Sequence, residues 1–114
     1  MDNESIEILL EIKEKLDRIC HGNKTCSNCC VREFEKKYNA QCNSCIHIYI
    51  VQYLLGDNEN TANFYKEEVI RFINACRETK CKECNITKLK IKHDELKEFD
   101  CTVIYFALKL LKDI

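Results

Sequence analysis

The chain has 114 residues with ten cysteines, two glycines and no proline, and its formal net charge is -1. This length is that of one domain, and the near-neutral charge excludes a polybasic tail or a wholly acidic disordered chain as its overall character. The scarcity of proline and glycine argues against a β-sandwich or barrel, so we expect a small, mainly helical, all-α protein forming a single domain over residues 1–114.

The apolar content suggests that packing alone does not hold this fold. Hydrophobic residues make up 46% of the chain, but about 37% once the ten cysteines are set aside, which is modest for a self-sufficient core. A structural zinc ion supplies roughly 10 to 16 kcal/mol of apparent folding energy in small finger peptides, against a margin of about 5 to 15 kcal/mol for a whole domain. We therefore expect bound metal to stabilise the protein.

The first segment predicts an amphipathic helix that ends near the first cysteine. Its apolar residues recur every three or four positions, at Ile6, Leu9, Ile12, Leu16 and Ile19. Acidic residues stand where a signal peptide needs basic ones, and no apolar run in the chain approaches 18 residues. We therefore expect a cytoplasmic protein without membrane association, in a compartment that favours metal-bound thiolates over disulfides.

The first cysteine-rich connector contains two closely spaced pairs, Cys26-Ser-Asn-Cys29 and Cys42-Asn-Ser-Cys45. A third pair of this kind, Cys81-Lys-Glu-Cys84, is present in the second half. Such pairs place two thiolates on one tight turn, as a tetrahedral metal ion requires. Between the first two pairs, the apolar residues of 31–38 predict a short helix.

The middle and last segments are also predicted to be helices, with one exception. The stretch 45–55 is apolar nearly all round and ends at Gly56, which suits a helix C-cap. A polar loop over 56–63, with Asn and Thr as available N-caps, then joins it to a helix predicted over 65–76. The segment 86–92 alternates in hydrophobicity and predicts an extended strand-like piece, whereas 101–112 has helical spacing.

The two halves of the chain, about 1–56 and 57–114, form an internal repeat. Cys45–Leu55 aligns without a gap with Cys101–Leu111, and the upstream cysteines match with nearly the same spacing. Each half is predicted to be a helix-knuckle-helix hairpin closed by four cysteines, so we expect two zinc ions. The predicted ligand sets are Cys20, Cys26, Cys29 and Cys45 in the first half, and Cys76, Cys81, Cys84 and Cys101 in the second.

Several ligand assignments stay open at this point. Cys42 is an alternative to Cys20, because two Cys-x-x-Cys pairs then give a general zinc-ribbon spacing. His93 is an alternative to one cysteine of the second set, and Cys30 is left over. An iron-sulfur cluster is a lesser alternative, because the second set opens with a ferredoxin-like spacing, although its loop is bulky and charged.

The sequence predicts binding rather than catalysis. The three histidines do not form a metal triad, no phosphate loop or nucleophile constellation is present, and four thiolates leave a metal no open position for substrate. We therefore expect no enzyme activity and structural metal sites. Residues 2–17 hold six acids and two lysines, net -4, whereas residues 77–92 hold six basic residues and two glutamates, net +4.

Such opposite charges suit a protein-binding module, that is, an adaptor, accessory subunit or inhibitor, and they are compatible with a homodimer. The alternative is a zinc-knuckle protein that binds nucleic acid through Lys80, Lys82, Lys88, Lys90 and Lys92. The composition, rich in Lys, Ile, Asn and Glu, also resembles that of small cysteine-bearing accessory proteins of phages and mobile elements. That resemblance implies action on a host complex.

Overall fold

The computed structural model describes residues 2–22, 29–40 and 45–113, and within them the regular elements are helices, with no strand. The all-α prediction is confirmed for this part of the chain. The helices are α1 (Asn3–Gly22), α2 (Cys30–Tyr38), α3 (Cys45–Leu55), α4 (Glu59–Glu78), α5 (Asn85–Lys92) and α6 (Cys101–Asp113), with short 3-10 turns η2 (Cys81–Glu83) and η3 (Asp94–Leu96) on either side of α5.

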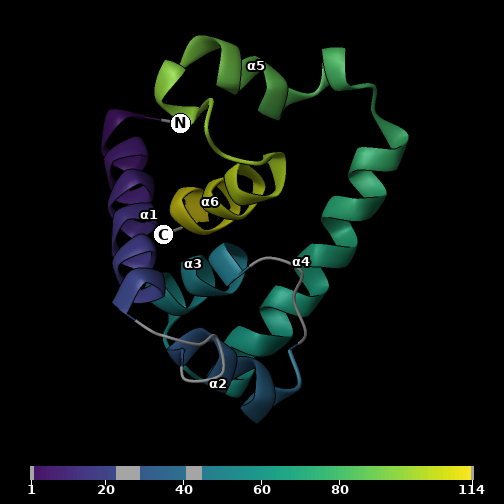
Figure 1. Cartoon of the computed structure of the whole chain (residues 1–114). Coiled ribbons are helices and arrows are strands. Elements are labelled where there is room, and N and C mark those ends of the chain that lie inside the picture. Colours follow the sequence, from purple (N-terminus) through teal and green to yellow (C-terminus); the bar gives the residue numbers. More distant parts are fainter. Residues whose placement is uncertain (1, 23–28, 41–44, 114) are drawn as a thin grey trace.

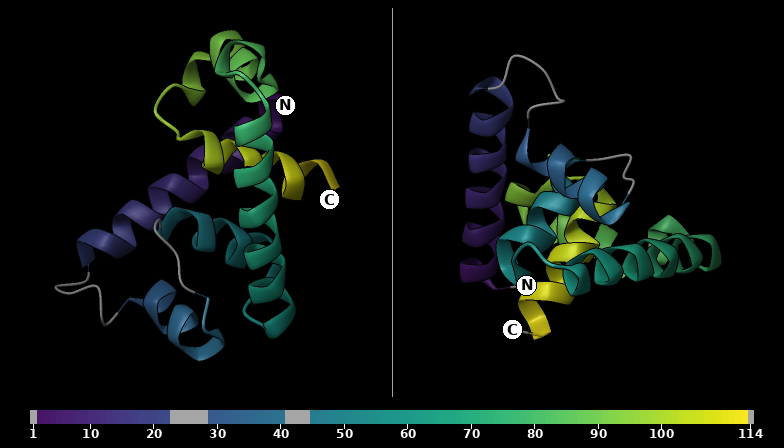
Figure 2. Two further views of the ribbon diagram at one scale, coloured as in Figure 1. Left: turned by 90° about the vertical axis from the view of Figure 1, so that its right-hand side faces the viewer. Right: turned by 90° about the horizontal axis from the view of Figure 1, so that it is seen from below.

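Helices α3 and α6 pack against each other in the middle of the molecule (Figure 1). Helix α1 covers one side of this pair and α4 the other, while α2 lies at the end next to α3 and α5 at the end next to α6 (Figures 1 and 2). The apolar residues of 45–55 are thus explained, because α3 has neighbours on several sides. The largest fully buried side chains include Leu9, Ile12, Ile48, Phe34 and Phe106.

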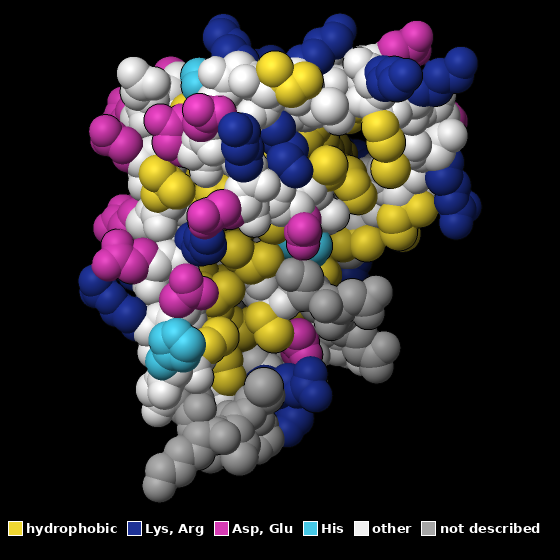
Figure 3. Space-filling view, turned by 45° about the horizontal axis from the view of Figure 1, so that its top comes forward, with side chains coloured by type: hydrophobic (Ala, Val, Ile, Leu, Met, Phe, Trp, Pro, Cys, Tyr) yellow, Lys and Arg dark blue, Asp and Glu magenta, His cyan; other side chains and the backbone are white. Residues whose placement is uncertain are grey.

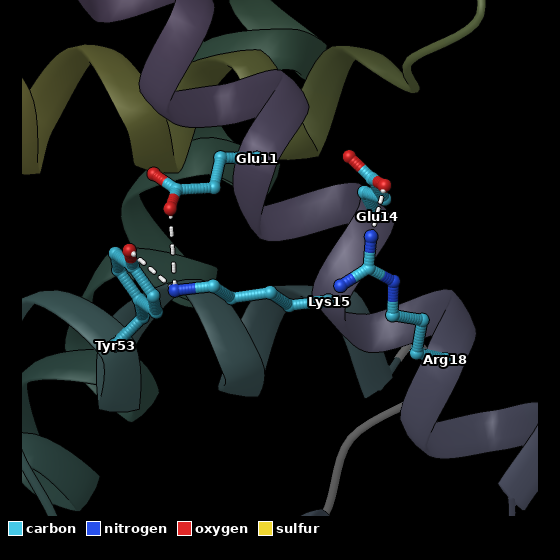
Figure 4. Close-up of polar contacts among 5 residues, drawn as sticks. All are labelled: Glu11, Glu14, Lys15, Arg18 and Tyr53. Atoms are coloured by element: carbon cyan, nitrogen blue, oxygen red, sulfur yellow. Dashed lines mark hydrogen bonds and ion pairs between the residues drawn. The ribbon is translucent and has the colours of Figure 1, made fainter.

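Helix α1 has the predicted amphipathic character. Its stripe of Ile6, Leu9, Ile12 and Leu16 is buried against the central pair, whereas its outer face carries exposed ion pairs (Figure 4). The ammonium group of Lys15 lies 3.2 Å from the carboxylate of Glu11 and also donates to the Tyr53 hydroxyl on α3 at 3.2 Å. This contact links the solvent faces of α1 and α3 across their seam.

The turn between α3 and α4 has the predicted capping but is shorter than the predicted loop. Gly56 adopts a φ of 91°, a conformation that favours glycine, and its N–H donates to the Gln52 carbonyl at 2.8 Å. The side chain of Asn58 then accepts from the Thr61 N–H at 2.9 Å as the N-cap of α4. Because the N-cap residue Asn58 lies near the start of the polar stretch 56–63, α4 begins at Glu59, and most of this stretch is helical.

One element prediction is wrong. The segment 86–92, expected to be extended, forms most of helix α5. A helix places Ile86 and Leu89 on one face, where Ile86 is buried and Leu89 packs against the core beside α6, while Ile91 remains 77% exposed. The alternating pattern was misleading because it counted Ile91 as an inward residue.

Each half of the described chain contains three α-helices, and the second half also contains the 3-10 turns η2 and η3. In the first half, α1 has 20 residues, α2 has 9 and α3 has 11. In the second half, α4 has 20 residues, α5 has 8 and α6 has 13. In each half the third helix packs against the first two, so that α3 contacts α1 and α2, and α6 contacts α4 and α5.

Candidate functional site

A groove lined by cysteines lies between the end of α4, the turn η2 with the start of α5, and the first part of α6. All four cysteines of the second predicted set, Cys76, Cys81, Cys84 and Cys101, line it, and its volume is about 520 Å³. These residues come from segments separated by up to 25 positions in the sequence. The sequence therefore identified four side chains that the fold brings to one surface feature.

The local structure explains how each cysteine reaches the groove. Cys76 lies two residues before the end of α4, Cys81 begins η2, Cys84 directly precedes α5, and Cys101 is the first residue of α6. The N–H of Cys84 donates to the carbonyl of Cys81 at 3.3 Å, which closes the tight turn expected of a Cys-x-x-Cys pair. Three of the thiols are exposed and Cys84 is half-buried.

The four thiols share the groove without converging on one point. Among the residues that the structure describes, no three Cys, His, Asp or Glu side chains are arranged to hold a metal ion. The groove walls are largely apolar, with Phe72, Ala75, Ile86 and Leu108 among the lining residues. The site is thus an open, apolar channel with thiols along it.

The first predicted set is described only in part, because Cys26 and the alternative ligand Cys42 lie outside the described residues. The three other members occupy places equivalent to those in the second half. Cys20 lies two residues before the end of α1, Cys29 directly precedes α2, and Cys45 is the first residue of α3. Cys29 is buried, whereas Cys20 and Cys45 are exposed.

The residues left open as alternatives lie elsewhere. His93 is half-buried between α5 and η3 and is not among the described residues that line the cysteine groove. Cys30 is the first residue of α2, where burial and the neighbouring Cys29 raise the pKa of its thiol. A raised pKa disfavours the thiolate form of Cys30.

Sequence reasoning missed a buried carboxylate next to the groove. Glu68 on α4 is 2% exposed and accepts hydrogen bonds from the Tyr105 hydroxyl at 2.9 Å and from the Arg71 guanidinium at 2.8 Å. Burial, together with the hydrogen bond to Glu68, raises the pKa of Tyr105 to about 12. The spacing of Glu68 from Tyr65 and Ala62, both buried on α4, was the available signal.

His47 on α3 is a half-buried polar residue of the central pair. Its ring stacks on Phe106 of α6 with 5.5 Å between ring centroids. Burial lowers the pKa of the imidazole, and the charge of Asp100 offsets this in part. The neutral ring therefore serves as a packing residue between α3 and α6.

A second cavity, of about 720 Å³, lies between the start of α1, α5 and the end of α6. Lys88 and Lys92 of α5 and Lys112 of α6 line it above Leu89 and Leu111. None of these three lysines forms an ion pair with a described residue. Figure 3 shows Lys and Arg side chains along the top of the molecule and carboxylates along the side where α1 lies.

Comparison with family models, with curated proteins and with solved structures gives no match to this chain. In the described part of the chain, no helix is both long enough and apolar enough to cross a membrane. The functional interpretation therefore depends on the two cavities and on the charges around them.

Proposed function

We propose that this protein is a small helical protein-binding module whose cysteines hold structural zinc, one ion in each half of the chain. The observation that carries the proposal is the placement of four cysteines, from α4, η2, the start of α5 and the start of α6, along one groove. Thiolates are common zinc ligands in proteins, and four of them satisfy the tetrahedral geometry of this ion.

Metal binding at this groove would require its walls to approach each other. The last turns of α4 have side chains on one wall, and the start of α6 and the Cys81–Cys84 turn provide the others. Gathering four sulfurs around one ion would bring the end of α4 onto α5 and α6 and cover apolar surface such as Phe72. The equivalent places of Cys20, Cys29 and Cys45 in the first half support a second site, completed by Cys26, with Cys42 as the alternative to Cys20.

A fully ligated zinc leaves no position for water or substrate, which favours a binding role over an enzymatic one. The charges support binding to another protein, because basic residues gather in the stretch 77–92 and acidic residues in the stretch 2–17 of the sequence. An adaptor, an accessory subunit or an inhibitor, including one carried by a phage or mobile element against a host complex, would use such a surface. A homodimer formed through the same charges fits this role.

Nucleic-acid binding is the second candidate, favoured by one observation. Among the described residues, no ion pair occupies any of the basic side chains of 77–92, which are therefore free to contact phosphates. Nothing aromatic lies between those residues to stack on bases, and the whole chain is slightly acidic. These features place the nucleic-acid role second.

Native mass spectrometry with elemental analysis, on reduced protein as purified, tests the metal part of the proposal. We expect two zinc ions in the wild type, one in Cys84→Ser and two in the matched control Cys30→Ser. Iron with sulfide would transfer the assignment to an iron-sulfur protein, and equal metal content in both variants would contradict the ligand sets.

Binding is tested separately with the same zinc-loaded protein. Chemical cross-linking in the cells that produce it, followed by mass spectrometry of linked peptides, should report contacts between residues 77–112 and one partner protein. A random single-stranded oligonucleotide should bind weakly at moderate salt. Tight oligonucleotide binding with a steep salt dependence would instead support the second candidate.

A further inference from the structure

We propose that the cavity between the start of α1, α5 and the end of α6 docks an acidic amphipathic segment of a partner protein. This inference rests on the proposed protein-binding function and names the surface and the chemistry of the partner. The cavity adjoins the cysteine groove, with which it shares Asn85, Leu108 and Lys112, but it has no cysteine among its described lining residues.

The cavity combines an apolar floor with a basic rim. Leu89 and Leu111 are half-buried, and Ala107 is fully buried, so the floor is aliphatic. Lys88 and Lys92 lie four residues apart on α5 and therefore share a helix face. With a volume of about 720 Å³, the cavity has room for a few aliphatic side chains of a docked segment.

The charges on the rim are not neutralised within the described chain. Lys88, Lys92 and Lys112 are exposed and form no ion pair with described residues. The one carboxylate among the lining residues, Asp2, accepts from the Ser5 N–H at 2.8 Å and so caps α1. This hydrogen bond lowers the pKa of Asp2, which favours its ionised form.

These features specify the occupant. The aliphatic floor favours binding of leucine-like side chains, and three lysines without ion pairs to described residues favour carboxylates at the rim. A helix or strand that carries both leucine-like side chains and carboxylates therefore fits best. A nucleic acid would use the lysines but gain nothing from the floor, since the cavity lining contains no aromatic ring for base stacking. A lone small anion would leave the aliphatic floor exposed.

Fluorescence anisotropy of zinc-loaded full-length protein with a labelled model peptide tests the proposal. The probe is an amphipathic helix of leucine and glutamate; one comparison peptide has glutamine for glutamate, and the other has alanine for leucine. The protein variants are Lys88→Gln/Lys92→Gln at the cavity and Lys80→Gln/Lys90→Gln as a control of equal charge. Both control positions belong to the same basic stretch, but neither lines the cavity.

We expect the cavity variant to bind the probe at least about fivefold more weakly than wild type, and the control variant to stay within about twofold. Both comparison peptides should also bind at least about fivefold more weakly. All four substitutions replace a lysine that is not buried, and circular dichroism verifies that each variant is folded.

Four results would overturn the inference. Equal loss in both variants would show a general charge effect, and tighter binding of a random oligonucleotide than of the probe would identify a nucleic-acid surface. Self-association that competes with the probe would make a second copy the occupant. Absence of probe binding by protein that carries two zinc ions and cross-links to a partner elsewhere would refute this site and leave the proposed function intact.

Discussion

The two ends of α4 are the same helix in different surroundings. In the N-terminal half of α4, Ala62, Tyr65 and Glu68 are each at most 3% exposed and face α3 and α6. In the C-terminal half of α4, Ile70 is 60% exposed and Ile73 is 42% exposed, and residues 73–78 are all exposed. One end packs against the core, while the other extends away from α3 toward α5 (Figure 2) and lines the cysteine groove.

This difference shows that apolar periodicity and packing are separate properties. Val69, Phe72, Ile73 and Cys76 also follow a three- and four-residue helical periodicity, as does the stripe that is buried in α1. The core ends before the stripe does, and cysteines lie beyond it instead of apolar partners. If the proposed zinc site forms, this partly packed stripe would be the wall that the bound metal draws toward α5 and α6.

Breaking the packed end should have the largest effect. Phe106 is fully buried and stacks with Tyr65 and His47, so Phe106→Ala should lower the free energy of unfolding by about 3 to 5 kcal/mol in urea denaturation. The matched change Phe72→Ala, on the groove wall, should cost less than about 2 kcal/mol because Phe72 is only half-buried. Equal losses would mean that the groove end is packed as well as the core.

Removing a ligand of the proposed zinc site should sharpen the contrast between the two ends of α4. Cys84→Ser should raise the rate of amide hydrogen exchange in residues 70–78 by at least about tenfold. These amides exchange when the end of α4 opens locally, and the loss of a metal ligand should make this opening more frequent. Exchange in 62–68 should change by less than about twofold. Cys30→Ser serves as the control and should match the wild type at both ends. A uniform increase along α4 would contradict local stabilisation by the metal.

A change at the middle of α4, where Glu68 accepts a hydrogen bond from Tyr105, should have the smallest effect on stability. Tyr105→Phe removes one hydrogen bond to a buried carboxylate and should lower stability by about 1 kcal/mol at neutral pH. The pKa of Tyr105 is raised to about 12 in the folded protein from the ordinary value of 10.0. Between these values the unfolded chain releases the proton first, so this stabilisation should be full below pH 10.0 and lost toward pH 12.

Urea denaturation across this pH range checks the expectation, together with the absorbance of tyrosinate. The wild type should lose stability more steeply than Tyr105→Phe as the pH rises. Glu68→Gln removes the negative neighbour and should shift the ionisation of Tyr105 to lower pH. Identical pH profiles for wild type and Tyr105→Phe would mean that the hydrogen bond contributes nothing to stability.

The helices themselves were largely predictable, because their causes are local. The i, i+3 and i+4 apolar spacing of α1, the left-handed Gly56 and the Asn58 cap each act within a few residues. The prediction for the segment 86–92 failed because short alternating runs fit a helix and a strand equally well, and only the surface of α6 decides between them.

The candidate site was predictable only as a set of residues. Spacing and the internal repeat pointed to Cys76, Cys81, Cys84 and Cys101, and the fold places them along one groove. The distances between their sulfurs depend on how closely α4 approaches α6, which is a tertiary property that no sequence spacing contains. The basic cavity was not foreseen either, because it combines lysines of α5 with Lys112, which lies 20 residues further along.

The basic cavity also places both ends of the described chain side by side. Asp2 and Ser5 from the start of α1 line it together with Leu111 and Lys112 from the end of α6. An affinity tag fused at either end would therefore lie over the surface proposed to bind the partner and could block it. Capture experiments are better served by a label at an exposed internal position such as Asp57, in the turn between α3 and α4.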